Sequence, residues 1–230
     1  MAEGRKSAAT AAKEANGKAL LTTGTRLLAF AAHPDDLEYY VGGSLAAYAA
    51  RGGHVTAVLA TDGERGGSCA FLGAVRREEQ QRAAQILGYR EVRFLGLPDR
   101  GLRYVQHRLF QAIEEVLRNS PAEVVLSFDG SRPMPPYIHA DHVAVGRAVM
   151  AACDRVDRHP ALYLFHTRAP DTIVDVTAFW HLKLEALRAY QSQSRGDQLP
   201  QGFRLLWRIV AGSSGFPMIP RRETLRRVMF

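Results

Sequence analysis

The stretch that begins at His33 has a high density of side chains that can do chemistry. The sequence HPDDLE, residues 33–38, directly follows the apolar run RLLAFAA. His33 and Asp36 supply an imidazole nitrogen and a carboxylate oxygen from one turn, and Pro34 stiffens that turn. These are ligand types that zinc accepts. Because two ligands do not make a tight site, a third is expected from a distant part of the chain.

A second cluster, HADH at residues 139–142, supplies His139, Asp141 and His142 as candidates for that third ligand. Two histidines and one aspartate with an open fourth position form a catalytic rather than a structural zinc arrangement, because water occupies the open position. Such an ion lowers the pKa of water to about 7. The two clusters therefore predict a metal-dependent hydrolase.

The side chains that do not bind the metal complete the predicted machinery. Asp35 is adjacent to Asp36 and is expected to accept the proton of the attacking water. His139, if protonated, would stabilise an oxyanion or protonate a leaving amine, with Asp141 orienting its ring. This set suffices for metal-assisted hydrolysis of an amide.

A structural explanation of the first cluster is the alternative. Aspartate is a favoured helix N-cap, and Asp35, Asp36 and Glu38 would all suit the positive end of a following helix. The HADH cluster alone is also compatible with an ordinary helix start. The presence of both clusters, each after a predicted strand, favours the metal site.

The pattern of apolar residues predicts an α/β fold, a Rossmann-like three-layer sandwich with a mostly parallel sheet. Apolar runs of strand length alternate with stretches of helical period. Ligands of such sheets bind outside the carboxyl ends of the strands, which is where both clusters fall. The runs are RLLAFAA, HVTAVLAT, EVRFLGL, AEVVLSF and ALYLF, and the helical stretches are residues 43–51, 74–87, 106–118, 141–154 and 178–190.

Composition predicts one catalytic domain over residues 23–230, preceded by a flexible lead-in, residues 1–22, that is poor in large apolar side chains. We expect a cytoplasmic protein, because neither a signal peptide nor a membrane span is visible. The two cysteines, Cys69 and Cys153, predict free thiols rather than a disulfide framework.

The formal net charge of +7 comes from the two ends of the chain, with +5 in the less regular section 195–230. This distribution argues against a nucleic-acid surface. A solvated basic tail is expected, with contact to lipid headgroups as the less favoured alternative. The apolar stretch at residues 202–219 is expected to pack in the core; a dimer contact or a lid is the alternative, so a homo-oligomer stays open.

The sequences AHPDD near the start and HADH about a hundred residues later resemble the LmbE-like family, also called PIG-L, of zinc-dependent N-acetylglucosaminyl deacetylases. The resemblance covers residues 26–193 approximately. It implies that His33, Asp36 and His142 bind Zn²⁺, or another divalent transition metal, that Asp35 is the general base, and that His139 is the electrophilic or acid group supported by Asp141.

Weaker matches imply further site residues. Tyr137 matches a tyrosine that contacts the reacting carbonyl, with packing in a proline-rich loop as the alternative. Arg76 in RREEQQRAAQILG, Glu64 in TDGERGG and Asp99 in LGLPDRGL match residues or loops that face the sugar. The chain departs from the family pattern where Leu37 precedes Glu38, where Ala140 replaces a frequent proline, and where YQSQ at residues 190–193 replaces HxSQ.

The predicted substrate is a small N-acetylglucosamine-type sugar or sugar conjugate, from which the enzyme releases acetate. An amidase of thiol-sugar conjugates would use the same residues. A non-catalytic sugar- or nucleotide-binding module is the third hypothesis, and it is disfavoured because no GxGxxG follows the first predicted strand.

Overall fold

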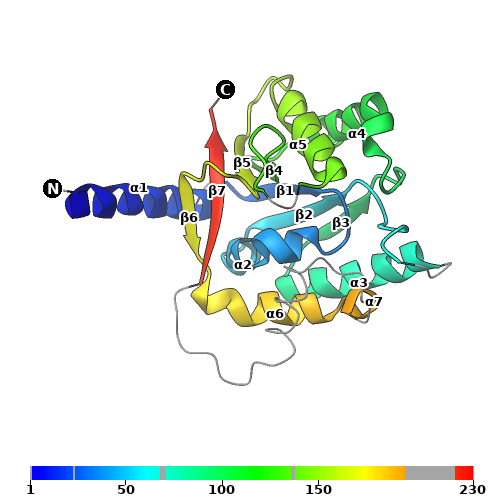
Figure 1. Ribbon diagram of the computed structural model, residues 1–230, viewed down its shortest axis with the longest axis horizontal. Coiled ribbons are helices and arrows are strands. Elements are labelled where there is room, and N and C mark those ends of the chain that lie inside the picture. The colour runs from blue at the N-terminus through cyan, green and yellow to red at the C-terminus, as the bar shows by residue number, and fades with distance from the viewer. Residues whose placement is uncertain (1, 23, 68–70, 136–137, 195–220, 230) are drawn as a thin grey trace.

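Five of the apolar runs form adjacent parallel strands in the computed structural model, which describes residues 2–22, 24–67, 71–135, 138–194 and 221–229 (Figure 1). Leu27 of the first strand pairs with Val55 on one side and Val124 on the other. The strands are β1 (Arg26–Ala31), β2 (His54–Leu59), β3 (Glu91–Phe94), β4 (Val124–Phe128) and β5 (Ala161–Phe165), in the order β3-β2-β1-β4-β5. Every residue of β4 is buried, as expected of a strand covered on both faces.

Helices cover both faces of the sheet and make three layers (Figure 1). On one face α2 (Asp36–Ala50), α3 (Leu72–Leu87) and α6 (Trp180–Arg188) contact one another, and on the other α4 (Gln106–Asn119) packs against α5 (Ala140–Cys153). The predicted three-layer α/β architecture is therefore confirmed. Short turns of helix, η1 (Leu102–Tyr104), η2 (Thr177–Phe179) and α7 (Gln191–Ser194), connect these elements.

The helix after β1 begins earlier than predicted. Periodicity placed its start at Gly43, whereas α2 begins at Asp36 and includes the acidic residues Asp36 and Glu38 in its first turn. Acidic side chains are favourable at this positive end of a helix. The helix thus fixes Asp36, and the loop from β1 to α2 fixes His33.

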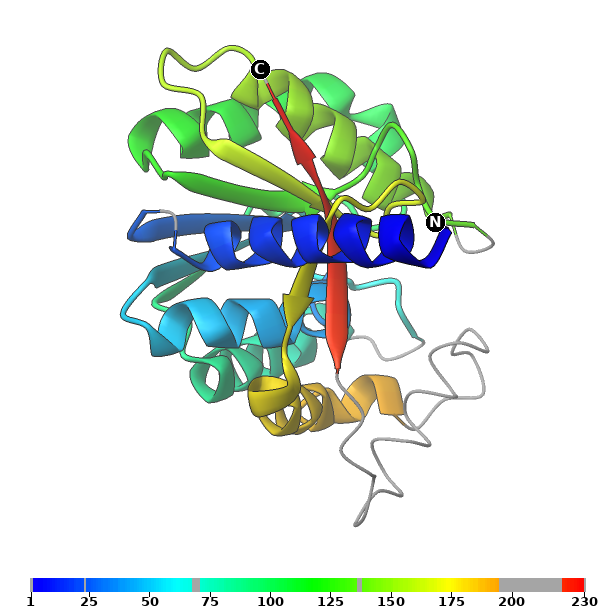
Figure 2. The same cartoon turned by 90° about the vertical axis from the view of Figure 1, so that its left-hand side faces the viewer.

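The prediction of a flexible lead-in for residues 1–22 was wrong, because these residues contribute helix α1 (Ala2–Thr22). Its C-terminal part contacts strand β6 (Thr172–Asp175) (Figure 2). Leu20 is 1% exposed, and the Asn16 side chain donates a hydrogen bond of 2.8 Å to the Asp171 carbonyl. The segment forms a helix despite its shortage of large apolar side chains, because it is rich in alanine, which has the highest helix propensity.

The prediction of a solvated basic tail is also wrong for the part of the C-terminus that the structure describes. Residues Arg222–Val228 form β7, which inserts between β5 and β6 and runs antiparallel to both. Glu223 and Leu225 are buried within it. The apolar stretch 202–219 and Cys69 lie outside the described residues.

The core lies between the sheet and its helices and is built mainly from Leu, Val, Ala and Phe side chains of the parallel strands. Cys153 at the end of α5 is buried and free, as predicted, and burial raises the pKa of its thiol to about 12. Within the residues described, no helix has both the length and the apolar composition needed to cross a membrane.

Candidate active site

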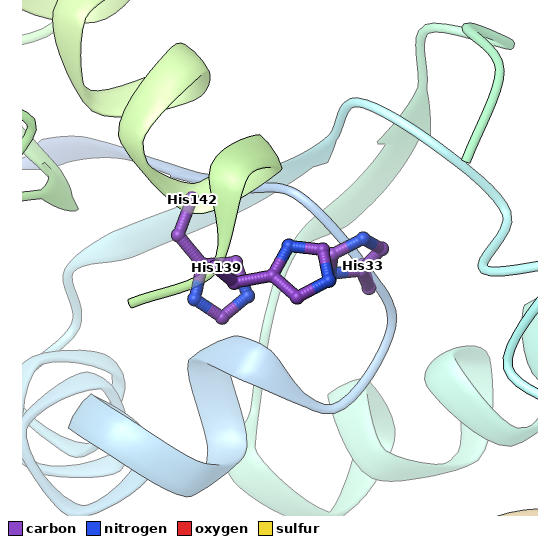
Figure 3. A group of neighbouring side chains, drawn as sticks. All are labelled: His33, His139 and His142. Carbon is purple, nitrogen blue, oxygen red and sulfur yellow. The ribbon is translucent and has the colours of Figure 1, made fainter. Parts of the chain in front are cut away.

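The two histidine clusters meet at the carboxyl ends of β1 and β4. His33 comes from the loop after β1, and His139 and His142 stand at the start of α5 (Figure 3). Their ring centroids are 4.9 Å apart for His33 and His139, 5.4 Å for His33 and His142, and 4.9 Å for His139 and His142. The structure therefore brings together residues more than a hundred positions apart in the sequence.

Asp36 joins two of these histidines. Its Oδ2 lies 3.3 Å from His33 Nδ1, and its Oδ1 lies 3.1 Å from His142 Nε2. The same Oδ2 accepts a hydrogen bond of 2.8 Å from the His33 backbone N–H. Burial alone would raise the pKa of Asp36, but His142 and His33 outweigh it and hold the pKa far below its usual range. The carboxylate is thus kept ionised between two imidazoles.

His33 has a second set of partners on its other nitrogen. Its Nε2 lies 3.0 Å from Asp99 Oδ1 and 3.5 Å from Asp141 Oδ2. Two groups of donor atoms lie within 4.8 Å of one another, namely His33 with His139 and His142, and His33 with Asp99 and Asp141. Asp36 belongs to neither group, although it contacts both His33 and His142, so the ligand set of His33, Asp36 and His142 stays a prediction.

Asp99 and Glu64 make contacts within the protein that the sequence did not predict. Asp99 is 3% exposed, and while its Oδ1 faces His33, its Oδ2 accepts a hydrogen bond of 2.9 Å from the Arg65 backbone N–H. Glu64 is exposed, and its carboxylate accepts from the Asp99 backbone N–H at 2.9 Å. Their assignment to sugar hydroxyls stays a prediction, and for Asp99 the structure supplies protein partners for both oxygens.

Asp35 is buried beside Arg76. The Arg76 guanidinium lies 3.0 Å from Asp35 Oδ2 and also donates hydrogen bonds to the carbonyls of Pro34 and Gly63. Burial raises the pKa of Asp35 to about 7, although the positive charge of Arg76 opposes this rise. Arg76 was predicted to contact the sugar, but it is 4% exposed and three of its contacts are with the protein.

His139 caps helix α5. Its Nδ1 accepts a hydrogen bond of 3.2 Å from the Asp141 backbone N–H, which places the proton of a neutral ring on Nε2. Burial lowers the pKa of His139 to about 4, with further lowering by His33 and His142, so the neutral ring is favoured over the protonated one that we had considered. The Asp141 carboxylate faces His33 and accepts from the Leu102 backbone N–H, whereas its predicted role was to orient His139.

Several neighbours of the site were not found in the sequence. The Phe128 ring stacks on His142 at 3.9 Å, and Tyr40 lies against both Phe128 and His166. His166 follows β5 directly, so the rule that strand ends carry the site would have found it. Tyr137, the predicted carbonyl contact, lies outside the described residues.

Backbone strain concentrates in this region. Three non-glycine residues of the described chain have positive φ: Asp35 at 87°, Arg100 at 57° and His166 at 54°. Each lies in the segment that follows a parallel strand, respectively β1, β3 and β5. Such conformations cost about 1–3 kcal/mol each and cluster at functional sites.

Comparisons with known proteins show which family and which relatives this chain resembles. The family model PIG-L, described as GlcNAc-PI de-N-acetylase, matches residues 28–153. A probable N-acetyl-alpha-D-glucosaminyl L-malate deacetylase 2 of Bacillus anthracis is 32% identical over 181 residues, which cover 70% of this chain and 78% of that protein.

Two solved structures are also similar. N,N'-diacetylchitobiose deacetylase from Pyrococcus horikoshii has a TM-score of 0.78 at 21% identity, covering 97% of this chain and 92% of its own. The 4-carboxy-2-hydroxymuconate hydratase from Pseudomonas putida has a TM-score of 0.69 at 26% identity, covering 89% of this chain and 96% of its own. Because the region matched by the family model contains both histidine clusters and more than half of the sequence, the chain belongs to the PIG-L family.

Proposed function

We propose that this protein hydrolyses the N-acetyl group of an N-acetylglucosamine-type sugar or sugar conjugate, with a divalent metal ion, zinc in the first instance, held by His33, Asp36 and His142. The observation that carries the proposal is the Asp36 carboxylate, which contacts both histidines while Asp35 stands next to it in the chain. The names of the deacetylase relatives support the reaction class.

The donor types of these three residues suit such an ion. Two imidazole nitrogens and a carboxylate oxygen are ligands that zinc accepts, and all three side chains are buried. His33 also has a carboxylate, Asp99, at the nitrogen opposite Asp36. A carboxylate at the outer nitrogen is typical of histidines that bind metals, because it fixes the ring and its tautomer. When bound, the ion supplies Lewis acidity, which polarises a carbonyl and makes water more acidic.

Asp35 is the proposed general base. A pKa near 7 allows a carboxylate to accept a proton in the reaction and to release it again near neutral pH. The water oxygen forms a bond to the acetyl carbon while its proton moves to Asp35, and the C–N bond then breaks as this proton passes to the sugar nitrogen. The second proton of the water stays on the product, so the free amine and acetic acid result, and the acid ionises to acetate near neutral pH.

His139 is the proposed partner of the acetyl oxygen. Because Nδ1 accepts the Asp141 backbone N–H, the proton of the neutral ring stands on Nε2, from which the ring would donate to the oxygen on which negative charge develops. This assignment replaces a positively charged histidine by a neutral hydrogen-bond donor. Arg76 contributes by holding Asp35 in place rather than by binding the sugar.

A hydratase is the second candidate, since one relative of the same fold carries that name at 26% identity. Addition of water to a carbon-carbon double bond also needs a base beside an activated water, but it releases no amine. Free-amine release therefore separates the two reactions.

The test is a screen of the zinc-loaded protein for amine release from N-acetylglucosamine, N,N'-diacetylchitobiose and the N-acetylglucosaminyl conjugates of malate and inositol. We expect release from at least one of these compounds. The screen also includes amides of thiol-sugar conjugates. If the protein cleaves these amides and none of the N-acetylated compounds, it is the conjugate amidase. Activity on none of them, together with hydration of an unsaturated carboxylic acid, would overturn the deacetylase proposal.

Asp35→Asn tests the assignment of the base. The variant should retain zinc, because Asp35 is not among the proposed ligands, and it should lose about 10²–10⁴-fold in kcat, the usual contribution of a general base. Zinc content measured by mass spectrometry and kcat measured on the best substrate decide the outcome. Unchanged kcat would remove Asp35 from this role.

A further inference from the structure

A second polar cluster lies next to Asp35 and contains none of the three histidines. It consists of Glu38 on α2, Gln80 on α3 and Tyr190 just after α6, and all three are 0% exposed. We call it the buried triad. A carboxyl group, an amide and a phenol that are removed from water cost free energy unless they hydrogen-bond one another. Their placement therefore requires an explanation.

The triad is closed by its own hydrogen bonds. Gln80 Nε2 donates to Glu38 Oε1 at 3.1 Å. The Tyr190 hydroxyl lies 2.7 Å from Glu38 Oε2 and 2.8 Å from Gln80 Oε1, so it bridges the other two side chains. These contacts fix the orientation of the Gln80 amide, with Nε2 toward Glu38 and Oε1 toward the Tyr190 hydroxyl.

The oxygen of that amide also reaches Asp35. Gln80 Oε1 accepts the backbone N–H of Asp35 at 3.4 Å. Asp35 is the residue with φ of 87°, a backbone conformation that non-glycine residues adopt only when their surroundings hold them there. The triad thus contacts the strained backbone of the proposed base.

Helix α3 holds Asp35 at two points. Arg76 contacts its carboxylate at 3.0 Å, and Gln80, one helical turn further along the same face, contacts its backbone. The segment after α6 is itself tied to α3, because Ser192 donates from its backbone and its hydroxyl to Glu79 at 2.8 Å and 2.6 Å. Tyr190 is therefore held on the helix whose Gln80 it orients.

We propose that Gln80 and Tyr190, together with Glu38, are positioning residues that hold the Asp35 backbone in its left-handed conformation and thereby aim its carboxylate at the reacting water. The role of Asp35 as base rests on the proposed function, whereas the fixing of its backbone rests on the contacts above. Neither Gln80 nor Tyr190 touches the predicted metal ligands in these contacts, so their removal should leave metal binding intact.

The test uses the zinc-loaded full chain with Tyr190→Phe and Gln80→Met, and Tyr163→Phe as the matched control. Tyr163 in β5 is also 0% exposed, and within the described residues its hydroxyl has no hydrogen-bond partner. Three quantities are measured: hydrogen exchange at the Asp35 backbone N–H, kcat and KM on the best substrate, and zinc content.

We expect the two triad variants to speed exchange at Asp35 and to lower kcat, each by about tenfold, the effect of one lost hydrogen bond. KM and zinc content should stay unchanged, and Tyr163→Phe should match the wild type in all three quantities. If Gln80→Met does not fold, Tyr190→Phe decides alone, because it deletes a single oxygen atom.

An unchanged exchange rate at the Asp35 N–H in a folded triad variant would overturn the proposal. An increase in this rate that is as large in the control Tyr163→Phe as in the triad variants would also overturn it. A wild-type protein that releases no amine from any compound would instead refute the proposed function. The exchange measurement would still decide whether the triad holds Asp35, so the two failures are distinguishable.

Discussion

Arg76 shows how one buried side chain organises the proposed base. Its guanidinium bonds to the Asp35 carboxylate and to the carbonyls of Pro34 and Gly63, which belong to loops after two different strands. A planar, permanently charged group with five donors suits several acceptors at once. A Cβ atom on Gly63 would lie 2.3 Å from Arg76 Nη1, so the close approach of the arginine requires glycine there.

Arg76→Met should destabilise the protein by about 1–3 kcal/mol, because it leaves the buried carbonyls of Pro34 and Gly63 without their donor. Arg77→Met is the matched control on the same helix. The Arg77 pair with Asp62, at 2.8 Å, involves a side chain that is 45% exposed, and exposed pairs contribute about 0–1 kcal/mol. Urea unfolding of both variants measures the difference. Equal losses would show that Arg76 has no special structural role.

At the level of residues, the sequence predicted which side chains lie together better than it predicted the direction in which each side chain points. The contacts of Asp36 with His33 and His142 follow from sheet topology, which brings strand ends together. Arg76 and Asp99 were matched to substrate, yet both bond to protein groups. Spacing along a chain does not say toward which partner a long or buried polar side chain turns.

At the level of elements, helix α1 packs on β6 through a glycine. A Cβ atom on Gly17 would lie 1.9 Å from the Ile173 carbonyl oxygen, so no larger residue fits at this contact. Burial of Leu20 then anchors the end of the helix in the core. The sequence did not indicate this contact, because small residues that permit close packing look the same as a solvated alanine-rich segment.

Gly17→Ala should destabilise the protein, whereas helix propensity alone predicts a gain of about 1 kcal/mol. The added methyl group must push α1 away from β6, and overpacking typically costs about 1–3 kcal/mol. Ala15→Gly, at an exposed position of the same helix, should cost about 1 kcal/mol through propensity. Thermal unfolding of both variants gives the sign, and a stabilised Gly17→Ala would contradict this packing.

Strand β7 is tied to the loop that leads from β4 toward His139. Arg226 Nε donates to Asp129 Oδ2 at 2.7 Å, and its Nη2 donates to Asp129 Oδ1 at 3.0 Å. The strand was missed because in RETLRRV only alternate residues face inward, and the inward pair of Glu223 and Leu225 includes a charge. Because the segment is rich in arginine, its composition predicted a solvated tail and not the strand that joins β5 to β6.

The Asp129 contact should make part of the stability depend on pH. Burial raises the pKa of Asp129, but hydrogen bonds from Arg226, Thr167 and Ser131 outweigh it and hold the pKa well below its usual value. The folded state therefore binds this proton less readily than the unfolded state. The stabilisation is complete above the unfolded pKa, about 3.9, and is lost as pH falls below it.

Asp129→Asn should accordingly be less stable than the wild type at pH 7, with a difference that shrinks as pH falls below about 4. Arg226→Met should show the same convergence, because it removes the other half of the pair. Urea unfolding from pH 3 to pH 7 measures both. A constant difference across this range would mean that the ionised carboxylate is not what stabilises the fold.

At the scale of the whole molecule, negative charge is gathered at the site and positive charge at the ends of the chain. The carboxylates of Asp36, Asp99 and Asp141 are all buried around His33 and His142, while the net charge of +7 is carried by the ends of the chain. Desolvated negative charges that face one another destabilise the folded state unless a cation or protonated histidines compensate them. The buried negative charge around the two histidines therefore favours the binding of a positive ion at this place.

Metal binding should therefore raise the stability of the whole molecule. An ion that binds only the folded state adds about 2.7 kcal/mol when its free concentration is a hundred times Kd, which corresponds to a rise in Tm of about 5–10 °C for a chain of this size. His142→Ala should abolish the rise, because it removes a proposed ligand, whereas His107→Ala on the exposed side of α4 should retain it. Thermal unfolding with buffered zinc and with a chelator measures these shifts. A rise of equal size in His142→Ala would show that His142 does not bind the ion. In that case His33→Ala should abolish the rise if the ion is bound by His33, Asp99 and Asp141, and should retain it if the ion binds outside this cluster.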